Sequence, residues 1–272
     1  MSLPIFMPSL TKSMSSYYPT PNFILSLHKK YGKNEDEAWL DLDDWKVNMA
    51  YETYNTTRDD GRLEREQNFW KAAAEGYDEW ITNDFQDQYE VNWDILTKYV
   101  HPTHRVLDVG CGPGDLSIRM AQQCHEVWGV DVTPEMIQVA EEKTAFEPVN
   151  VHFQQADACD LPFENDTFDT VMSVNALQTM CRPEMALAEM SRVLKPGGEF
   201  LLITYCFGDS SPSDSASLIN WAIKYRALAV WQSFKLTQVA DLLQANGFEV
   251  VEAERIWAEP VVGFLRGRSI TA

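Results

Sequence analysis

Residues 106–114 read Val-Leu-Asp-Val-Gly-Cys-Gly-Pro-Gly, and this stretch decides the fold. Its apolar first half predicts a short strand, which runs directly into glycines at positions 110, 112 and 114. Because glycine has no Cβ, the backbone can turn tightly there and a ligand can lie directly against it. The helix that we expect over residues 115–123 would point its unpaired N–H groups at that ligand. A strand, a glycine turn and a helix N-terminus together are typical of a nucleotide-binding crevice.

From residue 100 onward, strand-like and helix-like segments alternate, which predicts an α/β fold with a doubly wound sheet. The last two strands are so close in sequence that they should run antiparallel, so the final strand is reversed. The expected strands cover residues 105–110, 126–131, 149–157, 168–175, 199–206, 249–256 and 261–268. The expected helices cover residues 62–81, 85–99, 115–123, 134–143, 183–194, 218–231 in the cap after the fifth strand, and 237–247.

Capping and stop signals support three of these helices. Thr133 should cap the helix that Pro134 begins, and Thr237 should cap the helix that Gly247 ends. The run Lys-Pro-Gly-Gly at 195–198 should stop the helix over 183–194 before the next strand begins.

The chain is expected to divide near residue 100. Residues 1–99 would form a helical N-terminal lid and substrate segment, and residues 100–272 a ligand-binding domain with a cap insertion at about 207–236. Both additions are rich in aromatic side chains: Trp39, Trp45, Tyr51, Tyr54, Trp221, Tyr225, Trp231 and Phe234. These side chains would either roof the crevice with apolar surface or simply pack the cap onto the core.

Composition excludes several classes of protein. The net charge of −19, from 22 basic and 41 acidic side chains, disfavours nucleic acid and an anionic membrane surface as partners. No stretch approaches the ~20 apolar residues that span a bilayer. The five cysteines form no Cys-x-x-Cys pair, which favours free thiols, a cytoplasmic location and no metal site. The oligomeric state is left open.

Two further strand ends carry acidic residues that suit an adenosine ligand. Asp131 ends the second strand, where its carboxylate can accept hydrogen bonds from both ribose hydroxyls; support of a helix cap is the alternative. Asp157 ends the third strand and can accept from an adenine amino group, with Ala158 leaving room for the ring; a simple turn residue is the alternative. The spacing Gly-x-Gly-x-Gly differs from that of dinucleotide sites.

Five ordered motifs carry a resemblance to a known family. They read Val-Leu-Asp-Val-Gly-Cys-Gly-Pro-Gly (106–114), Gly-Val-Asp-Val-Thr-Pro-Glu-Met (129–136), Ala-Asp-Ala-Cys-Asp-Leu-Pro-Phe (156–163), Phe-Asp-Thr-Val (168–171) and Arg-Val-Leu-Lys-Pro-Gly-Gly (192–198). The chain resembles the class I S-adenosylmethionine-dependent methyltransferases, especially the ubiquinone/menaquinone C-methyltransferase-like group of small-molecule enzymes. Gly-Tyr-Asp-Glu-Trp at 76–80 is similar to the Tyr-Asp element of that group. The resemblance implies a seven-stranded, Rossmann-like sheet with an antiparallel last strand.

The resemblance also implies S-adenosylmethionine as the cofactor. The methionine part would lie against Asp108, Gly110 and Gly112, with Tyr77 and Trp80 closing over it. Asp131 would hold the ribose, Asp157 and Ala158 would read the adenine edge, and Met136 would pack on adenine unless it is an ordinary core residue. The full set expected at the cofactor is Tyr77, Trp80, Asp108, Gly110, Cys111, Gly112, Asp131, Val132, Met136, Asp157, Ala158 and Asn175.

Catalytic residues are harder to predict, because the chain departs from its relatives after the fourth strand. Many relatives have histidine there, whereas residues 176–180 read Ala-Leu-Gln-Thr-Met. His28 is then the histidine left as a candidate base, since His101, His104 and His125 precede strands at the far edge. Gln178 and Asn175 could orient a polar group of the substrate without moving a proton.

The sequence therefore predicts a methyltransferase of secondary metabolism that acts on a small, apolar or aromatic metabolite at O, N or C. The missing histidine and the aromatic cap leave open a cofactor-binding enzyme that catalyses a cyclisation or rearrangement instead. A nicotinamide-dependent reductase on a related sheet is a third alternative.

Overall fold

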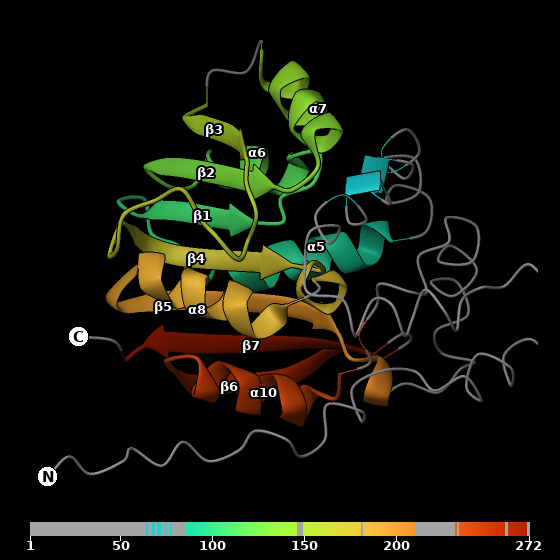
Figure 1. Cartoon of the computed structure of the whole chain (residues 1–272), viewed down its shortest axis with the longest axis vertical. Coiled ribbons are helices and arrows are strands. Elements are labelled where there is room, and N and C mark those ends of the chain that lie inside the picture. The colour runs from blue at the N-terminus through green and yellow to red at the C-terminus, as the bar shows by residue number, and fades with distance from the viewer. Residues whose placement is uncertain are drawn as a thin grey trace, which may run out of the picture.

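A seven-stranded sheet organises the protein (Figure 1), with strand order β3-β2-β1-β4-β5-β7-β6. The computed structural model describes residues 64, 67, 68, 70, 71, 74, 77, 85–145, 149–180, 182–209, 232, 234–258 and 261–270. The strands are β1 (Arg105–Val109), β2 (Glu126–Asp131), β3 (Val151–Gln155), β4 (Phe168–Val174), β5 (Leu194–Tyr205), β6 (Phe248–Ala258) and β7 (Val261–Ser269). The α-helices include α5 (Gln86–Leu96), α6 (Asp115–Met120), α7 (Pro134–Thr144), α8 (Pro183–Val193) and α10 (Leu236–Ala245), and the 3-10 helices include η3 (Leu177–Thr179) and η4 (Phe207–Asp209).

Strand directions confirm the expected doubly wound sheet. Strand β1 lies in the middle and pairs in parallel with β2 and β4, and β4 pairs in parallel with β5. Strand β7 inserts between β5 and β6 and runs antiparallel to both. All parallel strands therefore end at one edge of the sheet, and the strand order reverses between β1 and β4. Ligands bind at this point in open α/β sheets.

The two faces of the sheet are covered by different helices (Figure 1). Successive side chains of β1 point to opposite faces of the sheet. Val106 belongs to the apolar cluster beneath α5 and α6, and Leu107 belongs to the cluster beneath α8 and α10. In β5, Leu201 and Leu202 divide between the same two clusters. Each fully buried aliphatic side chain contributes roughly 1.5–3 kcal/mol. This two-sided burial fixes the register that holds the strand ends in place.

Helix α5 belongs to the same core, although its residues precede position 100. Its Ile95 and Leu96 are buried in one cluster with Val106 of β1 and Met120 of α6. The division of the chain near residue 100 stays a prediction, and the core contacts of α5 cross it. The helix ends at Leu96, earlier than the expected Tyr99.

The start of α10 corrects one capping prediction. Thr237 lies inside the helix, whose N-cap is Lys235. The amide N–H groups that open the helix are satisfied by Gln238 Oε1, which accepts from Lys235 N at 2.8 Å, and by Asp209 Oδ2, which accepts from Leu236 N at 2.9 Å. Two side-chain acceptors in the first turn and in η4 thus replace the threonine hydroxyl. Thr133 does occupy the cap position of α7 but makes no side-chain capping bond.

Strand β5 begins five residues earlier than expected. It starts at Leu194, directly after α8, and includes the Lys-Pro-Gly-Gly run at 195–198. The pairing with β4 shifts register between Phe168 and Thr170, which absorbs these extra residues as an irregularity, and Gly197 has a positive φ of 71°. The helix does end just before this run, but the run itself belongs to strand β5, whose register is irregular there. Helix α6 is likewise shorter than predicted and ends at Met120.

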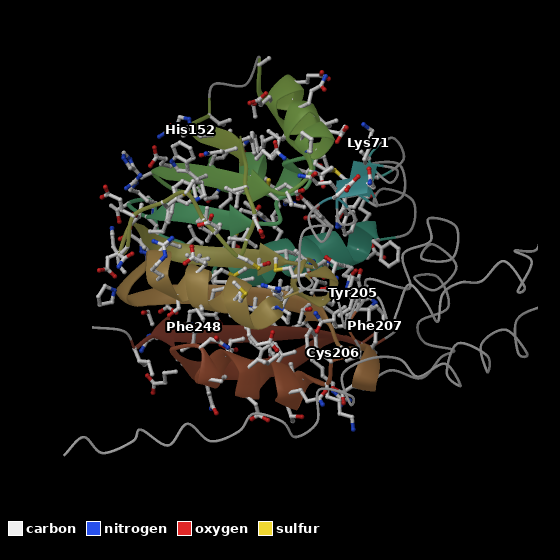
Figure 2. All side chains as sticks on the ribbon, viewed as in Figure 1. Lys71, His152, Tyr205, Cys206, Phe207 and Phe248 are labelled. Atoms are coloured by element: carbon white, nitrogen blue, oxygen red, sulfur yellow. The ribbon has the colours of Figure 1, made fainter. Side chains whose placement is uncertain are left out.

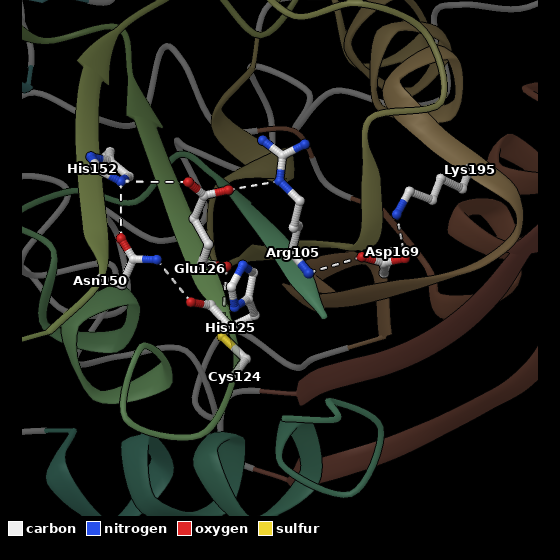
Figure 3. A network of polar contacts seen from close by, with 8 residues as sticks. All are labelled: Arg105, Cys124, His125, Glu126, Asn150, His152, Asp169 and Lys195. Carbon is white, nitrogen blue, oxygen red and sulfur yellow. Dashed lines mark hydrogen bonds and ion pairs between the residues drawn. The ribbon is translucent and has the colours of Figure 1, made fainter. Parts of the chain in front are cut away.

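Polar contacts link the residues at the other end of the parallel strands, where these strands begin (Figure 3). Glu126 Oε2 accepts from Arg105 Nε at 2.6 Å, and Lys195 Nζ lies 2.5 Å from Asp169 Oδ1. His152 Nε2 lies 3.1 Å from Asn150 Oδ1. The carbonyl of His125 accepts from Asn150 Nδ2 at 2.9 Å. The N–H of His125 donates to His104 O at 3.0 Å, and the N–H of His104 donates to His101 O at 2.9 Å, so these three histidines lie together at the far edge as expected.

Several predictions fall on residues that the structure does not describe. They include His28, Trp80, most of the helix expected over 62–81 and the cap over 210–231, with Trp221, Tyr225 and Trp231. Phe234 is described and is fully buried in the α8–α10 cluster, which is the packing alternative rather than the roof. Over the described ranges, no helix has the length and apolarity to cross a membrane. Within the same ranges, no group of three or more metal-ligating side chains occurs.

Candidate functional site

Two adjoining cavities open where the parallel strands end. We call the one at the ends of β1, β2 and β3 the β2-side cavity, with a volume of about 70 Å³, and the one beneath helix α5 the α5-side cavity, with a volume of about 560 Å³. Of the predicted residues, the β2-side cavity is lined by Gly112, Asp131, Val132, Met136, Asp157 and Ala158. The α5-side cavity is lined by Asp108 and Cys111, and both cavities are lined by Tyr77, Gly110 and Asn175.

The glycine turn after β1 brings bare backbone to both cavities. Gly110, Gly112 and Gly114 all have positive φ, at 79°, 54° and 84°. A Cβ on Gly110 would lie 2.5 Å from the Cβ of Ala176, so no other residue fits there. A Cβ on Gly112 would meet nothing within 4 Å among the described residues. Gly112 therefore faces open space, as a backbone that carries a ligand must.

Asp131 is bonded to the same turn. Its Oδ2 accepts from Gly112 N at 3.0 Å and its Oδ1 accepts from Thr133 N at 2.9 Å. Burial raises the pKa of this carboxyl, while the bonds from Thr133 and Gly112 act in the opposite direction. A carboxylate oxygen can accept more than one hydrogen bond, so this group could also accept from a ligand hydroxyl. The aspartate thus both fixes the loops and faces the β2-side cavity.

Asp157 and Met136 combine structural and cavity-lining positions. Asp157 Oδ1 accepts from Cys159 N at 2.9 Å, and its carbonyl accepts from Asp160 N at 3.0 Å, so the predicted turn role is confirmed. Met136 is 2% exposed, as a core methionine would be. Both residues still line the β2-side cavity, so a ligand contact stays a prediction for each.

Asp108 lies in the α5-side cavity, deep below the glycine turn. It is 2% exposed, and Ser117 Oγ donates to its Oδ2 at 2.6 Å. Burial raises the pKa of Asp108 to about 7, against the hydrogen bond from Ser117, and nearby Asp131 adds to the rise. Burial also raises the pKa of the Cys111 thiol well above its ordinary value. A buried carboxylate of this kind is prepared to receive a cation.

Gln178 proves to be a support for Asn175 rather than a cavity residue. It is 2% exposed and does not appear among the described lining residues of either cavity. Its Nε2 donates to the carbonyl of Asn175 at 2.6 Å, and its Oε1 accepts from the Thr204 hydroxyl at 2.8 Å. This corrects its expected place beside the substrate, because η3 turns the side chain back into the core. The bond holds Asn175 at its positive φ of 55°.

The N-terminal segment reaches the β2-side cavity through two helical residues, of which Tyr77 was expected at the cofactor and Trp70 was not. Trp70 and Tyr77 both line it, with ring centroids 6.3 Å apart in an edge-to-face arrangement. Gln67 Nε2 donates to the carbonyl of Val132 at 2.9 Å, and Lys71 Nζ lies 2.6 Å from Glu135 Oε1. The seven-residue spacing of Trp70 and Tyr77 was the signal available in the sequence, because it puts both rings on one helix face.

The comparisons with known proteins agree with this geometry. A family model described as a methyltransferase domain matches residues 106–198. The uncharacterized methyltransferase YcgJ of Bacillus subtilis is 35% identical over 178 residues, which cover 65% of this chain and 69% of that protein. The ubiquinone/menaquinone biosynthesis C-methyltransferase UbiE of Teredinibacter turnerae is 31% identical over 182 residues, covering 64% and 70%. The chain belongs to the class I S-adenosylmethionine-dependent methyltransferases.

Solved structures show the same fold for this methyltransferase. The crystal structure of YcgJ from Bacillus subtilis aligns with a TM-score of 0.53 at 23% identity, covering 68% of this chain and all of that one. A Haemonchus contortus phosphoethanolamine N-methyltransferase in complex with S-adenosylhomocysteine aligns with a TM-score of 0.63 at 20% identity, covering 76% and 61%. Membership of this family establishes S-adenosylmethionine as the cofactor of the methyltransferase.

The residues at the site fit this cofactor. The open space at Gly112 would accommodate a ligand against the backbone, and the Asp131 carboxylate lines the cavity where a ribose would need an acceptor. Asn175 Oδ1, buried and without a hydrogen-bond partner among the described residues, lies where the two cavities meet. A nucleoside on the β2 side and an amino acid chain on the α5 side would occupy both spaces and leave room in the larger one.

Proposed function

We propose that this methyltransferase transfers the methyl group to a small, apolar or aromatic metabolite. The single observation that carries the proposal is the junction of the two cavities at Gly110 and Asn175. The larger cavity exceeds what a methionine chain needs, and its apolar lining includes Phe85, Leu116 and Val174. It therefore offers room for an acceptor beside the cofactor.

The proposed cofactor contacts divide between the cavities. Asp131 would bind the ribose hydroxyls, and Asp157 with Ala158 would contact the adenine edge. Asp108 would bind the ammonium group of the methionine end, since its buried carboxylate gains most from a cationic partner. These roles are supported by the lining of each cavity and by the motifs that the relatives share.

When bound, the cofactor supplies an electrophilic methyl group on a sulfonium. The chain's part is to align the acceptor and to exclude water, and alignment can contribute roughly 7–11 kcal/mol to lowering the barrier. Among the described residues that line the α5-side cavity there is no histidine. Alignment of the acceptor in this cavity is therefore the main catalytic contribution that we propose for the described residues.

Methyl-labelled S-adenosylmethionine tests the proposal. Incubation with a panel of aromatic and terpenoid metabolites should move the label into an organic product and yield one S-adenosylhomocysteine per product. A new product that carries no label would instead support the cyclisation or rearrangement hypothesis. Stabilisation by a nicotinamide nucleotide, and not by S-adenosylhomocysteine, would contradict both. A cytoplasmic location and a substrate other than nucleic acid stay predictions.

A further inference from the structure

Three buried polar atoms at the α5-side cavity have no hydrogen-bond partner among the described residues. They are Nε2 of Gln88, Oδ1 of Asn92 and Oδ1 of Asn175. Gln88 and Asn92 lie one turn apart on α5, each 2% exposed, and Asn175 follows β4. All three residues line the cavity that the methionine end of the cofactor would enter. Because buried polar groups almost always have partners, these atoms point to a ligand that carries both donors and acceptors.

Tyr205 fixes which atom Gln88 presents to the cavity. Its hydroxyl donates to Oε1 of Gln88 at 2.9 Å, and the tyrosine is 4% exposed at the end of β5. Figure 2 shows Tyr205 on the side of the sheet where the parallel strands end. Burial raises the pKa of Tyr205 far above its ordinary value, so the phenol keeps its proton and remains a donor. The amide oxygen is therefore occupied, and the N–H groups of Nε2 are left for an acceptor.

The backbone N–H groups of the glycine turn at 110–114 are already bonded within the chain. Those of residues 110 and 111 donate to the carbonyl of Val130, at 2.8 and 3.0 Å. That of residue 112 donates to Asp131 Oδ2 at 3.0 Å, and that of residue 114 to the carbonyl of Cys111 at 3.2 Å. Pro113 has no N–H group. A carboxylate that enters this cavity would therefore bond to side chains, and Nε2 of Gln88 is a buried donor left for it.

The charges around the cavity favour an ammonium group over a lone anion. No Lys, Arg or His occurs among the described residues that line the cavity. Two of its carboxylates have cationic partners: Glu90 pairs with Arg119 at 2.9 Å. Asp115 pairs with Lys143 at 2.8 Å. An anion would enter beside the buried carboxylate of Asp108 with no cation to balance it, whereas an ammonium group would pair with Asp108.

The amino acid end of S-adenosylmethionine matches these atoms group by group. Its ammonium group has three N–H donors and no lone pair, so it suits the oxygens of Asp108, Asn92 and Asn175. Its carboxylate has lone pairs and no proton, so it suits Nε2 of Gln88. The two groups also balance one another's charge within the ligand. The carboxylate therefore brings its own cation into a cavity whose described lining offers none.

We propose that neutral amides in the α5-side cavity recognise the amino acid end of the cofactor. Gln88, positioned by Tyr205, donates to the carboxylate. Asn92 and Asn175 accept from the ammonium group, which pairs with Asp108. The inference rests on the placement of the methionine end in the proposed function, and it does not depend on the acceptor. Its distinctive consequence is that the ammonium group contributes more affinity than the carboxylate, because a deaminated ligand leaves an anion beside Asp108 without any cation.

Analogues of S-adenosylhomocysteine that each lack one group test the inference on the full chain. A hydrogen replaces the ammonium group in the deaminated analogue and the carboxylate in the decarboxylated analogue. We expect calorimetry to show that affinity falls by about 100-fold or more on deamination but only by about tenfold on decarboxylation. Equal losses, or a larger loss on decarboxylation, would contradict the inference.

Matched variants assign each ligand group to its residue. Gln88→Met keeps the side-chain length and removes the amide, so the loss on decarboxylation should shrink to about twofold or less while the loss on deamination persists. Asn92→Leu removes one oxygen from the ammonium group, so the loss on deamination should shrink by about tenfold while the loss on decarboxylation persists. Asn92→Asp keeps that oxygen and should retain both losses. Gln244→Met, at an exposed glutamine of α10, should also leave both unchanged.

Two further variants separate positioning from folding. Tyr205→Phe should shrink the loss on decarboxylation less than Gln88→Met does, because the amide remains but is no longer fixed. The double variant Gln88→Met/Tyr205→Phe leaves no polar group unpaired between these two positions, so it gives the same readout if Gln88→Met is unstable. A decarboxylation loss that survives in the double variant would contradict the inference, as would an equal change of both losses in Gln88→Met or Asn92→Leu.

The inference and the proposed function fail in different experiments. If both losses behave as expected but no apolar or aromatic metabolite receives the methyl label, the proposed function is wrong and the inference holds. If the label is transferred but the two losses are equal, the inference is wrong and the proposed function holds. Failure of the wild-type chain to bind S-adenosylhomocysteine would contradict both.

Discussion

The two cavities share one edge of the sheet but treat their polar groups differently. On the β2 side, the carboxylates of Asp131 and Asp157 are already bonded to backbone N–H groups of the loops that carry them. On the α5 side, Gln88, Asn92 and Asn175 each leave a buried polar atom without a partner among the described residues. The chain therefore completes the first cavity by itself, whereas the second depends on what enters it.

The largest expected effect comes from adding one methyl group to the β2-side cavity. Gly112→Ala places a Cβ in space that is open among the described residues and adjoins the cavity, so it should block the ligand directly. We expect affinity for S-adenosylhomocysteine to fall by about 100-fold or more in calorimetry, which corresponds to about 2.7 kcal/mol.

Gly197→Ala is the matched control for this substitution. Gly197 also has a positive φ, and a Cβ there also meets nothing within 4 Å among the described residues, but it lies in the bulge of β5. Both variants should lose similar stability, about 1–2 kcal/mol, from the left-handed backbone. If Gly197→Ala and Gly112→Ala had similar ligand affinities, the position of Gly112 at the cavity would not matter for binding, and the contrast between the cavity and the rest of the fold would be wrong.

A smaller loss should follow from removing the carboxylate that braces the glycine turn. Asp131→Ala removes the acceptor for Gly112 N and Thr133 N, together with the proposed ribose contacts. We expect cofactor affinity to fall by more than about tenfold, or about 1.4 kcal/mol, measured by calorimetry. Asp241→Ala, on the exposed face of α10, should change nothing. An unaltered affinity in the Asp131 variant would show that the ribose does not bind at Asp131.

The last expected effect concerns stability rather than ligand affinity, and it is a pH dependence in the cofactor-free protein. The pKa of Asp108 is about 7 in the folded chain against an ordinary 3.8, so the folded state holds a proton that the unfolded state releases between these values. This contribution to the free energy of unfolding is present at about pH 4 and is lost as the pH rises to about 7. Asp108→Asn lacks this contribution. Its free energy of unfolding in urea should therefore rise relative to that of the wild type as the pH increases over this range.

Asp169→Asn should show the opposite pH dependence of stability. Burial raises the pKa of Asp169, but the Arg105 amide and the Lys195 ammonium outweigh it and hold the pKa below its ordinary value. The wild type should therefore keep its advantage over this variant near neutral pH and lose it in acid. A stability difference for Asp108→Asn that does not vary with pH would show that its carboxyl is ionised in the free protein.

The sequence predicted the sheet because its signals are local and repeated. The motif at 106–114, the acidic residues at strand ends and the short gap between the last two strands each constrain the backbone within a few residues. The same signals placed Asp131, Asp157 and Met136 at the cavity. They also carried the family resemblance, since those residues lie inside the ordered motifs.

What the sequence could not show depends on contacts between distant segments. The inward turn of Gln178 follows from Thr204, which lies on another strand. The α5-side cavity was missed because Gln88 and Asn92 look like ordinary polar residues of a surface helix until Tyr205 is brought beside them. Likewise, Asp209 stabilises the start of α10 only because η4 folds back to it.

Strand β6 has a consequence for how copies of this protein meet one another. It is the outermost strand beside β7, so one row of its backbone groups lacks a neighbouring strand in the described sheet. Two irregularities interrupt its pairing, and Glu249, Glu254 and Arg255 are exposed along it. Interrupted, charged borders of this kind resist strand addition by another chain. We therefore expect the exposed edge of β6 to resist strand-mediated aggregation even in concentrated solutions of the protein.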